Sequence, residues 1–177
     1  MTKLFPALAA GLMTFVAPAV GQEPAPRTTA ESEPTQATYL VTGLHCPPCT
    51  RTVESSLTGV KGILAVKVDW KTKTAHIEFD ETVLPAQGIS RLIAATPHMM
   101  GGAMHYGGWL ALKTPGIKDE ATAKQAEEAL SAVEGVKTAK AYPAQHTIAA
   151  YFSAKGDVTT RQLIESLKTA GFEAELF

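Results

Sequence analysis

One pattern occurs twice in this sequence, and this repeat constrains the fold more than any other feature. Residues 53–63 (VESSLTGVKGI) align with residues 126–136 (AEEALSAVEGV) at an offset of 73 residues. The same offset pairs Gly43 with Gly116. A unit of this length is too long for one turn of a solenoid and long enough for a small domain. We therefore expect two related structural units in the chain.

Each copy shows the same order of hydrophobic patterns. After a short strand at 39–42, helical spacing places Cys49, Val53 and Leu57 on one face. The other elements expected in the first copy are strands at 63–70 and 74–79, a helix from 89 that stops before 97, and a short strand within 102–106. The elements expected in the second copy lie at 109–114, 123–133, 136–142, 147–153, 160–170 and 172–177.

This order of elements predicts an α+β chain of tandem ferredoxin-like βαββαβ domains. The first domain is expected at 37–107 and the second at 108–177, with a boundary near Gly107–Gly108 and almost no linker. Two small domains are consistent with a chain of 177 residues in which 45% are hydrophobic.

The N-terminal segment has the pattern of an export signal. A single Lys3 precedes a mostly apolar run at 4–20, followed by small residues at the −3 and −1 positions of a cut after residue 21. We expect a signal peptide at 1–21 and a disordered leader at 22–36, which is rich in Pro, Glu, Ser and Thr. The alternative is an uncleaved anchor, but the run is short for a span and contains two prolines.

The mature protein is therefore expected to be periplasmic or secreted, with no membrane insertion after signal cleavage. Its charge is nearly balanced, with 16 Lys+Arg and 17 Asp+Glu in the whole chain. A nucleic-acid partner is not expected, because nucleic-acid binders carry a basic surplus.

The two cysteines of the chain lie in one motif, Gly-Leu-His-Cys-Pro-Pro-Cys, at residues 43–49. Two thiolates at this spacing can bind one soft metal ion. Cys46 is expected at the N-cap of the following helix, where the helix dipole lowers a thiol pKa. Cys49 lies one turn further, on the apolar face, so we expect it to be the more buried thiol and Cys46 the exposed one.

The strand, the Gly-x-x-Cys-x-x-Cys loop, the helix and the βαββαβ order resemble the heavy-metal-associated domain. That family includes copper chaperones, the metal-binding domains of copper-transporting ATPases and the periplasmic mercury-binding protein. The resemblance covers about residues 37–106 and implies that Cys46 and Cys49 are the metal thiolates. Leu44 stands where the family usually has Met, and the two prolines between the cysteines are unusual.

The second copy lacks these ligands. At the 73-residue offset, Asp119 and Thr122 replace the two cysteines, and both are common residues at the start of a helix. We expect this copy to be a degenerate domain without a Cys-x-x-Cys site.

A second cluster of candidate ligands lies at the end of the first copy. Outside the expected signal, all methionines are Met99, Met100 and Met104, and two histidines flank them, His98 and His105. The repeat pairs His98 with Phe172, on a loop expected to face Cys46. His98 is therefore predicted as a third member of the metal site, whereas metal contacts by His45, His105 or the methionines are left open.

Cu(I) is the expected ion, because thiolate, thioether and imidazole ligands favour it over hard cations. Hg(II) is the main alternative, and Zn(II) a further one if His45 and His98 complete four ligands with the cysteines. The expected role is sequestration of the metal or its delivery to a transporter or cuproenzyme. The rival class is a thiol–disulfide oxidoreductase, since an exported Cys-x-x-Cys is also a redox motif. We expect no enzyme, because a repeat of this length lacks room for the longer elements and the cis-proline loop of that fold.

Overall fold

The computed structural model describes residues 33–177, so the expected signal peptide and most of the expected leader lie outside the described residues. The first strand begins inside the expected leader, at Thr35. The elements, in order, are β1 (Thr35–Thr42), α1 (Pro47–Leu57), β2 (Ile63–Asp69), β3 (Thr74–Phe79), α2 (Ala86–Ala95), β4 (Gly107–Lys113), α3 (Glu120–Ser131), β5 (Val136–Tyr142), the 3-10 turn η1 (Pro143–Gln145), β6 (Thr147–Phe152) and α4 (Thr160–Thr169). None of these helices is long and apolar enough to cross a membrane.

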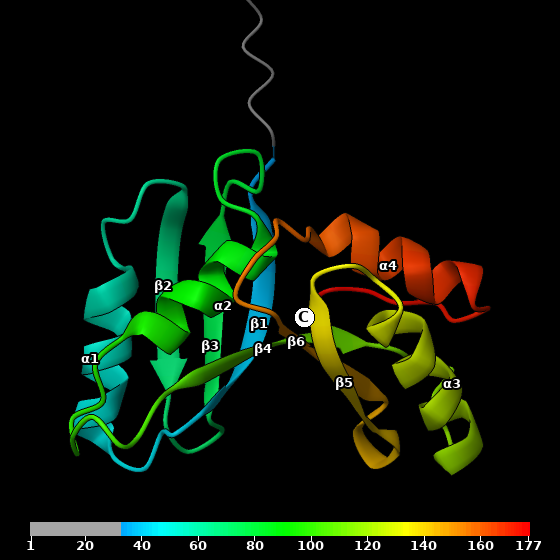
Figure 1. Cartoon of the computed structure of the whole chain (residues 1–177), viewed down its shortest axis with the longest axis horizontal. Helices are drawn as coiled ribbons and strands as arrows, with labels where there is room; N and C mark the ends of the chain where they lie inside the picture. Colours follow the sequence, from blue (N-terminus) through cyan, green and yellow to red (C-terminus); the bar gives the residue numbers. More distant parts are fainter. Residues whose placement is uncertain (1–32) are drawn as a thin grey trace, which may run out of the picture. The chain divides into compact units, whose positions relative to one another are not determined.

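The six strands form a single sheet in the order β2-β3-β1-β4-β6-β5 (Figure 1). The expected tandem arrangement of two separate domains is thus not what the structure shows. The described chain is an α+β fold of the ferredoxin-like type that forms one compact unit. The two repeats lie at opposite ends of one sheet and meet at its centre.

Strand β4 is shared by the two repeats. Its residues 107–111 pair antiparallel with β1, and its residues 109–113 pair antiparallel with β6. It is therefore both the last strand of the first repeat and the first strand of the second. The short strand expected within 102–106 is absent, and the expected boundary at Gly107–Gly108 lies inside β4.

The glycines at the start of β4 explain why the strand can occupy this central position. A Cβ atom on Gly108 would lie 2.8 Å from Cδ1 of Ile93 in α2 and 3.3 Å from the Ser90 backbone. Helix α2 can therefore approach the strand closely only where the side chain is absent. Gly108 thus serves helix packing, and Gly107, where a Cβ atom would lie 2.6 Å from the Thr42 hydroxyl, allows close approach of β1. Neither glycine belongs to a linker between domains.

The repeat seen in the sequence is reproduced in the hydrogen bonds. The Glu54 carboxylate accepts a 2.8 Å hydrogen bond from the Val68 N–H, and the Glu127 carboxylate accepts a 2.7 Å hydrogen bond from the Ala141 N–H. Each pair ties the first helix of its repeat to the following strand, at the same 73-residue offset. The second repeat is less complete at its end, where the expected strand at 172–177 is reduced to one bridge to β4.

The hydrophobic core lies between the helices and one face of the sheet. Tyr39 of β1 is fully buried, lies opposite Leu110 of β4 and donates a 2.9 Å hydrogen bond to the Ala86 carbonyl of α2. Leu112, two residues further along β4, lies on the same face and is also buried. Because alternate side chains of a strand point to opposite faces, Leu40 and Ala111 face away from the helices.

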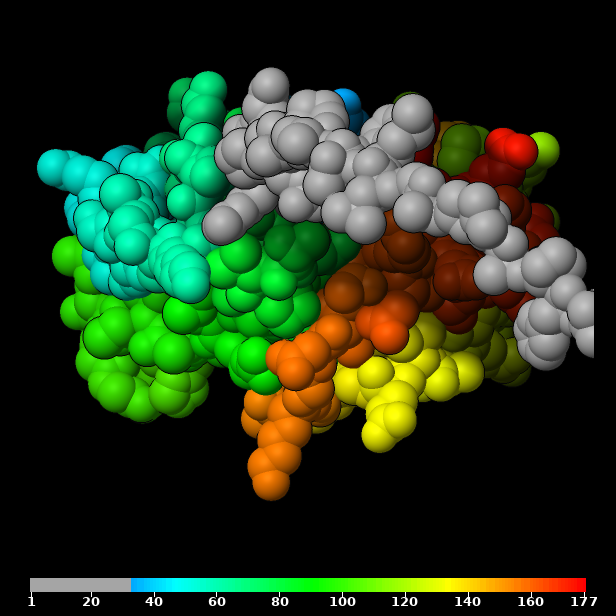
Figure 2. Space-filling view, turned by 90° about the horizontal axis from the view of Figure 1, so that it is seen from above, coloured from blue at the N-terminus to red at the C-terminus, as the bar shows by residue number. Residues whose placement is uncertain are grey.

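A buried polar side chain joins the repeats on the helical side. The amide nitrogen of Gln87 in α2 donates 2.9 Å hydrogen bonds to the carbonyls of Ser153 and Lys155. Its carbonyl oxygen accepts a 3.0 Å hydrogen bond from the Val158 N–H. Figure 2 shows the α2 region in green directly beside the loop before α4 in orange. The two repeats are therefore held together by specific hydrogen bonds as well as by a common strand.

Candidate metal centre

The loop between β1 and α1, residues 43–46, is called the metal loop below. It begins at Gly43, which has a positive φ of 86°. A Cβ atom at this position would lie 2.7 Å from the His105 carbonyl oxygen and 3.2 Å from the Tyr106 ring. Glycine is thus required both by the backbone conformation and by the close approach of the α2–β4 loop. Leu44 follows and is buried at 1% exposure, which supports the loop from beneath.

Helix α1 places the two cysteines at its first turn. Cys46 is the N-cap residue with extended backbone angles, and Pro47 and Pro48 occupy the first helical positions, where a missing N–H costs nothing. Cys49 is fully buried on the face that also carries Val53, whereas Cys46 is half-buried. The predicted difference in exposure between the two thiols is confirmed.

Both cysteines are free thiols, and their sulfur atoms lie 2.8 Å apart. A metal ion bound between two thiolates in a nearly linear way holds the sulfurs about 4 Å or more apart, since metal–sulfur bonds are about 2.3 Å long. Metal binding therefore requires a side-chain rotation. Cys46 is the thiol that can rotate, because it is the less buried of the two.

The thiol with the lowered pKa is Cys49, and not Cys46 as the helix-dipole argument predicts. Burial acts to raise the pKa of Cys49, but the Cys46 thiol, the His45 backbone and the nearby Tyr106 hydroxyl favour the thiolate and lower the pKa to about 7. The pKa of Cys46 is raised, chiefly because its thiol proton is held by Cys49. The negative charge is therefore favoured on the inner sulfur, that of Cys49.

Tyr106 is a residue of the site that sequence reasoning missed. It is buried, and among residues 33–177 its hydroxyl has no hydrogen-bond partner of good geometry. Burial and the neighbouring Cys49 raise the pKa of Tyr106 to about 12, so the hydroxyl stays protonated. It is thus available to donate a hydrogen bond to Cys49 once that thiol is ionised. An aromatic residue just before a glycine pair gave no sequence signal for this role.

His98 lies next to the metal loop, as the repeat alignment predicts. Its ring is 4.5 Å from the Tyr106 ring and 6.0 Å from the His45 ring, measured between centroids. Nε2 lies 3.0 Å from the Gly43 carbonyl oxygen, and Nδ1 accepts a 3.2 Å hydrogen bond from the Met100 N–H. Both ring nitrogens therefore have backbone partners, and neither is available as a ligand in this conformation. The metal role of His98 stays a prediction, and ligation would require at least one of these bonds to break.

The other candidate ligands lie around the loop. His45 and His105 are exposed, and Met99 and Met100 are exposed at 55% and 68%. Within residues 33–177, no group of three or more His, Cys, Asp or Glu side chains is placed to hold a metal ion. The four-ligand zinc set of the two cysteines with His45 and His98 is therefore not assembled.

The second repeat has an ordinary helix start at the equivalent place. The Asp119 carboxylate accepts a 2.8 Å hydrogen bond from the Thr122 N–H, and the Thr122 hydroxyl completes a capping box. Phe172 is buried and would be 3.1 Å from a Cβ atom on Gly116. Phe172 thus contacts Gly116 in the second repeat, just as His98 contacts Gly43 in the first. This equivalence confirms the alignment of His98 with Phe172.

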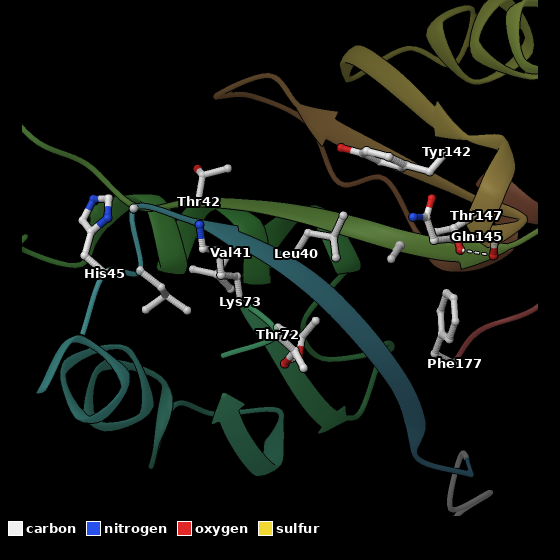
Figure 3. Close-up of a pocket in the computed structure, with 14 residues that line it drawn as sticks. Leu40, Val41, Thr42, His45, Thr72, Lys73, Tyr142, Gln145, Thr147 and Phe177 are labelled. Carbon is white, nitrogen blue, oxygen red and sulfur yellow. Dashed lines mark hydrogen bonds between the residues drawn. The ribbon is translucent and has the colours of Figure 1, made fainter. Parts of the chain in front are cut away.

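A cavity of about 610 Å³ extends from the metal loop across the sheet face that points away from the helices. Figure 3 shows His45 at one end and Tyr142 and Phe177 at the other. Its floor includes Leu40 and Ala111, and the small side chain of Ala111 leaves the hollow open. The hydrophobic pattern of the strands could not predict this cavity, because it depends on how β5 and the C-terminal segment border the sheet.

The thiol pair lies at a strand–helix junction, where two soft sulfur ligands are available to one metal ion. Residues 38–97 match the family model of the heavy-metal-associated domain. Over these residues the chain is similar to that family, which agrees with the resemblance inferred from the sequence.

Three known proteins or solved structures are similar to parts of this chain. The chain is 32% identical over 66 residues to a protein of Archaeoglobus fulgidus named probable copper-exporting P-type ATPase, and this alignment covers 37% of the chain and 8% of the relative. Among solved structures, the water-soluble region of the P-type ATPase CopA from Bacillus subtilis is 21% identical with a TM-score of 0.40, covering 81% of this chain and 91% of that chain. Oxidised MerP from Ralstonia metallidurans CH34 is 25% identical with a TM-score of 0.37, covering 44% of this chain and 96% of that chain.

Proposed function

We propose that this protein binds one Cu(I) ion between Cys46 and Cys49 and acts in copper sequestration or delivery. The observation that carries the proposal is the pairing of a buried thiol, with a pKa lowered to about 7, and a half-buried thiol at the N-cap of the same helix. The inner sulfur supplies a thiolate near neutral pH, and the outer one can rotate to close the site.

A two-coordinate thiolate site suits Cu(I) because this ion is soft and accepts low coordination numbers. Hg(II) would accept the same two sulfurs, so the choice between them rests on other support. The relative from Archaeoglobus fulgidus is named as a copper exporter, which favours copper. Zn(II) is disfavoured because both nitrogens of His98 are hydrogen-bonded to the backbone.

The half-buried position of Cys46 also suits transfer of the ion to another protein. A partner with its own thiolates could attack the metal from the exposed side while Cys49 still holds it. We propose a metal transporter of the P-type class, or a cuproenzyme, as this partner. The proposed setting is the periplasm or the exterior, following the export pattern at the N-terminus, and the proposed role is not catalytic.

Anaerobic Cu(I) titration against a competing chelator tests this function. The wild type should bind one ion tightly, Cys46→Ser and Cys49→Ser should each abolish tight binding, and the matched substitution Asp119→Ala in the second repeat should leave it unchanged. Retention of tight 1:1 binding by the double cysteine variant would refute the assignment of the site. Insulin-reductase activity of the metal-free protein would favour the oxidoreductase alternative, and metal analysis of protein from its native compartment would separate copper from mercury.

A further inference from the structure

The loop between α2 and β4 exposes sulfur to solvent. All three methionines of residues 33–177 lie in it, namely Met99, Met100 and Met104. Met99 and Met100 are 55% and 68% exposed, although methionine is among the residue types most often buried. Met104 is half-buried. The thiol site described above uses none of these three thioethers.

Two consecutive turns fold this loop compactly. The Gly101 N–H donates a 3.2 Å hydrogen bond to the His98 carbonyl, and the Met104 N–H donates a 3.2 Å hydrogen bond to the Gly101 carbonyl. Gly101 has a positive φ of 105°, which permits the reversal between the turns. Met99 and Met100 occupy the middle of the first turn, and Met104 ends the second. Methionine side chains are long and unbranched, so three of them on such short turns can converge on one ion.

The loop is fastened to the metal loop by His98. The imidazole is hydrogen-bonded to the Gly43 carbonyl on one side and to the Met100 N–H on the other. The Met99 backbone lies beside the Tyr106 hydroxyl, whose other neighbour is Cys49. The loop that carries the exposed thioethers is therefore held against the loop that carries the cysteines.

We propose that Met99, Met100 and Met104 form a second soft-metal site, an all-thioether site that takes up Cu(I) and passes it to Cys46 and Cys49. This proposal rests on the proposed function, in which the thiol pair binds Cu(I). Thioethers are soft neutral ligands that select Cu(I) and need no deprotonation. Thiolates carry charge and bind the ion more tightly, so the direction of transfer is inward.

Transfer is a ligand exchange without a redox change. The copper ion remains Cu(I) while bonds to thioether sulfurs break and bonds to thiolate sulfurs form. The thiol protons are released to water as the Cu–S bonds form. The thioethers return to their metal-free state and can accept another ion.

The test is NMR of protein labelled with ¹³C in the methionine methyl groups, titrated anaerobically with Cu(I). The double variant Cys46→Ser/Cys49→Ser should still bind one Cu(I), more weakly than the thiol pair does, with shifts of the methyl signals of Met99, Met100 and Met104. Zn(II) should shift none of them, because thioethers bind it poorly. Unmoved methyl signals in this variant under excess Cu(I) would overturn the proposal.

Two further variants separate this inference from the function of the thiol pair. The triple variant Met99→Leu/Met100→Leu/Met104→Leu conserves side-chain volume, should bind one Cu(I) at the thiols with unchanged affinity, and should load more slowly from a chelator, on the order of tenfold. An unchanged rate of Cu(I) loading in the triple variant would contradict the transfer role. Failure of the wild-type thiols to bind Cu(I) would instead contradict the proposed function. In Leu64→Met, a lone thioether stands at a position that is 61% exposed on β2, and Cu(I) should leave its methyl signal unmoved. A shift there equal to that of the loop would mean that the loop is no specific site.

Discussion

The side-chain oxygen of Gln87, in the second helix of the first repeat, accepts a 3.0 Å hydrogen bond from the Val158 N–H, just before the last helix of the second repeat. Gln87 is fully buried, and its amide nitrogen bonds to two further carbonyls of the same loop. One side chain of the metal-binding repeat therefore satisfies three backbone groups of the repeat that lacks thiols.

Replacing Gln87 should destabilise the whole chain. In Gln87→Ala, buried backbone groups near Val158 lose their partner, and we expect a loss of about 3 kcal/mol in the free energy of unfolding. Guanidinium unfolding followed by circular dichroism measures this loss. Gln125→Ala is the control, because Gln125 is exposed on α3, and it should change stability by less than about 0.5 kcal/mol. Equal effects of the two substitutions would mean that the Gln87 network contributes nothing.

The two repeats should unfold together. Because β4 is hydrogen-bonded to both β1 and β6, neither repeat has a complete sheet alone. We expect a single unfolding transition with coincident fluorescence and circular dichroism signals. A fragment of residues 108–177 should be largely unfolded by NMR, since it lacks β1 and Gln87. A well-dispersed spectrum of this fragment would show that the second repeat is independent after all.

Gly43→Ala should disturb the metal loop through backbone strain and through a steric clash. Gly59→Ala is the control that has the backbone strain alone. Both glycines have a positive φ, 86° and 80°, but an added Cβ atom meets the His105 carbonyl at 2.7 Å only in the first case. Gly59→Ala should cost about 1 kcal/mol from backbone strain alone. Gly43→Ala should cost more and should also weaken Cu(I) binding, measured by chelator competition. If both variants bind copper as the wild type does, the close approach of the α2–β4 loop does not shape the site.

Tyr106→Phe should raise the pKa of Cys49. The Tyr106 hydroxyl helps to hold this pKa at about 7, because it favours the thiolate, so its removal moves the midpoint of thiol reactivity to higher pH. The rate of iodoacetamide labelling as a function of pH measures the shift. Tyr39→Phe is the control, because the Tyr39 hydroxyl bonds to Ala86 and not to the site. An unchanged midpoint in Tyr106→Phe would remove Tyr106 from the site.

The lowered pKa of Cys49 also predicts a pH dependence of stability. The folded value of about 7 lies below the ordinary value of 9.0, so the unfolded chain binds more protons between these two pH values. The contribution of Cys49 to stability is fully present above the unfolded pKa and is lost as pH falls through the folded one. Metal-free protein should therefore gain stability between pH 7 and 9 relative to Cys49→Ala, measured by the denaturant midpoint of each.

His98→Phe tests whether the imidazole orients the loop or binds the metal. The substitution installs the residue type found at Phe172 and removes the hydrogen bond to the Gly43 carbonyl. We expect Cu(I) affinity to fall by about tenfold or less, as is usual for residues that act through a ligand loop. The fall should be equal at pH 6 and pH 8 if His98 only orients the loop. A fall that grows with pH would indicate that the neutral ring is a ligand.

The sequence predicted the repeat, the helices and the thiol pair because each has a local signal. The spacing of Cys49, Val53 and Leu57 marks a helix face, and the repeat, with one residue inserted in the second copy, aligns His98 with Phe172. These features depend on nearby residues or on comparison within the chain. They required no knowledge of how the two repeats pack.

The features that were missed depend on distant contacts. The sharing of β4 could not be predicted, because the pattern of each repeat, taken separately, predicts a complete set of strands for that repeat. The lowered pKa belongs to Cys49 because the Cys46 thiol and the nearby Tyr106 hydroxyl favour its thiolate and outweigh both burial and the position of Cys46 at the helix end. The sequence placed His98 correctly beside the loop, but it could not show that both ring nitrogens are hydrogen-bonded. One partner is the Gly43 carbonyl, 55 residues away, and the other is the Met100 N–H in the same turn.

The common strand β4 makes the first repeat structurally dependent on the repeat without thiols. A gene rearrangement that removed residues 107–177 would leave β1 with an open edge, and exposed edges of this kind favour aggregation. The metal-binding unit therefore cannot be exchanged between proteins as a self-sufficient module cut at Gly107. Its neighbour completes it structurally, so the copy that holds the cysteines depends on the copy that holds none.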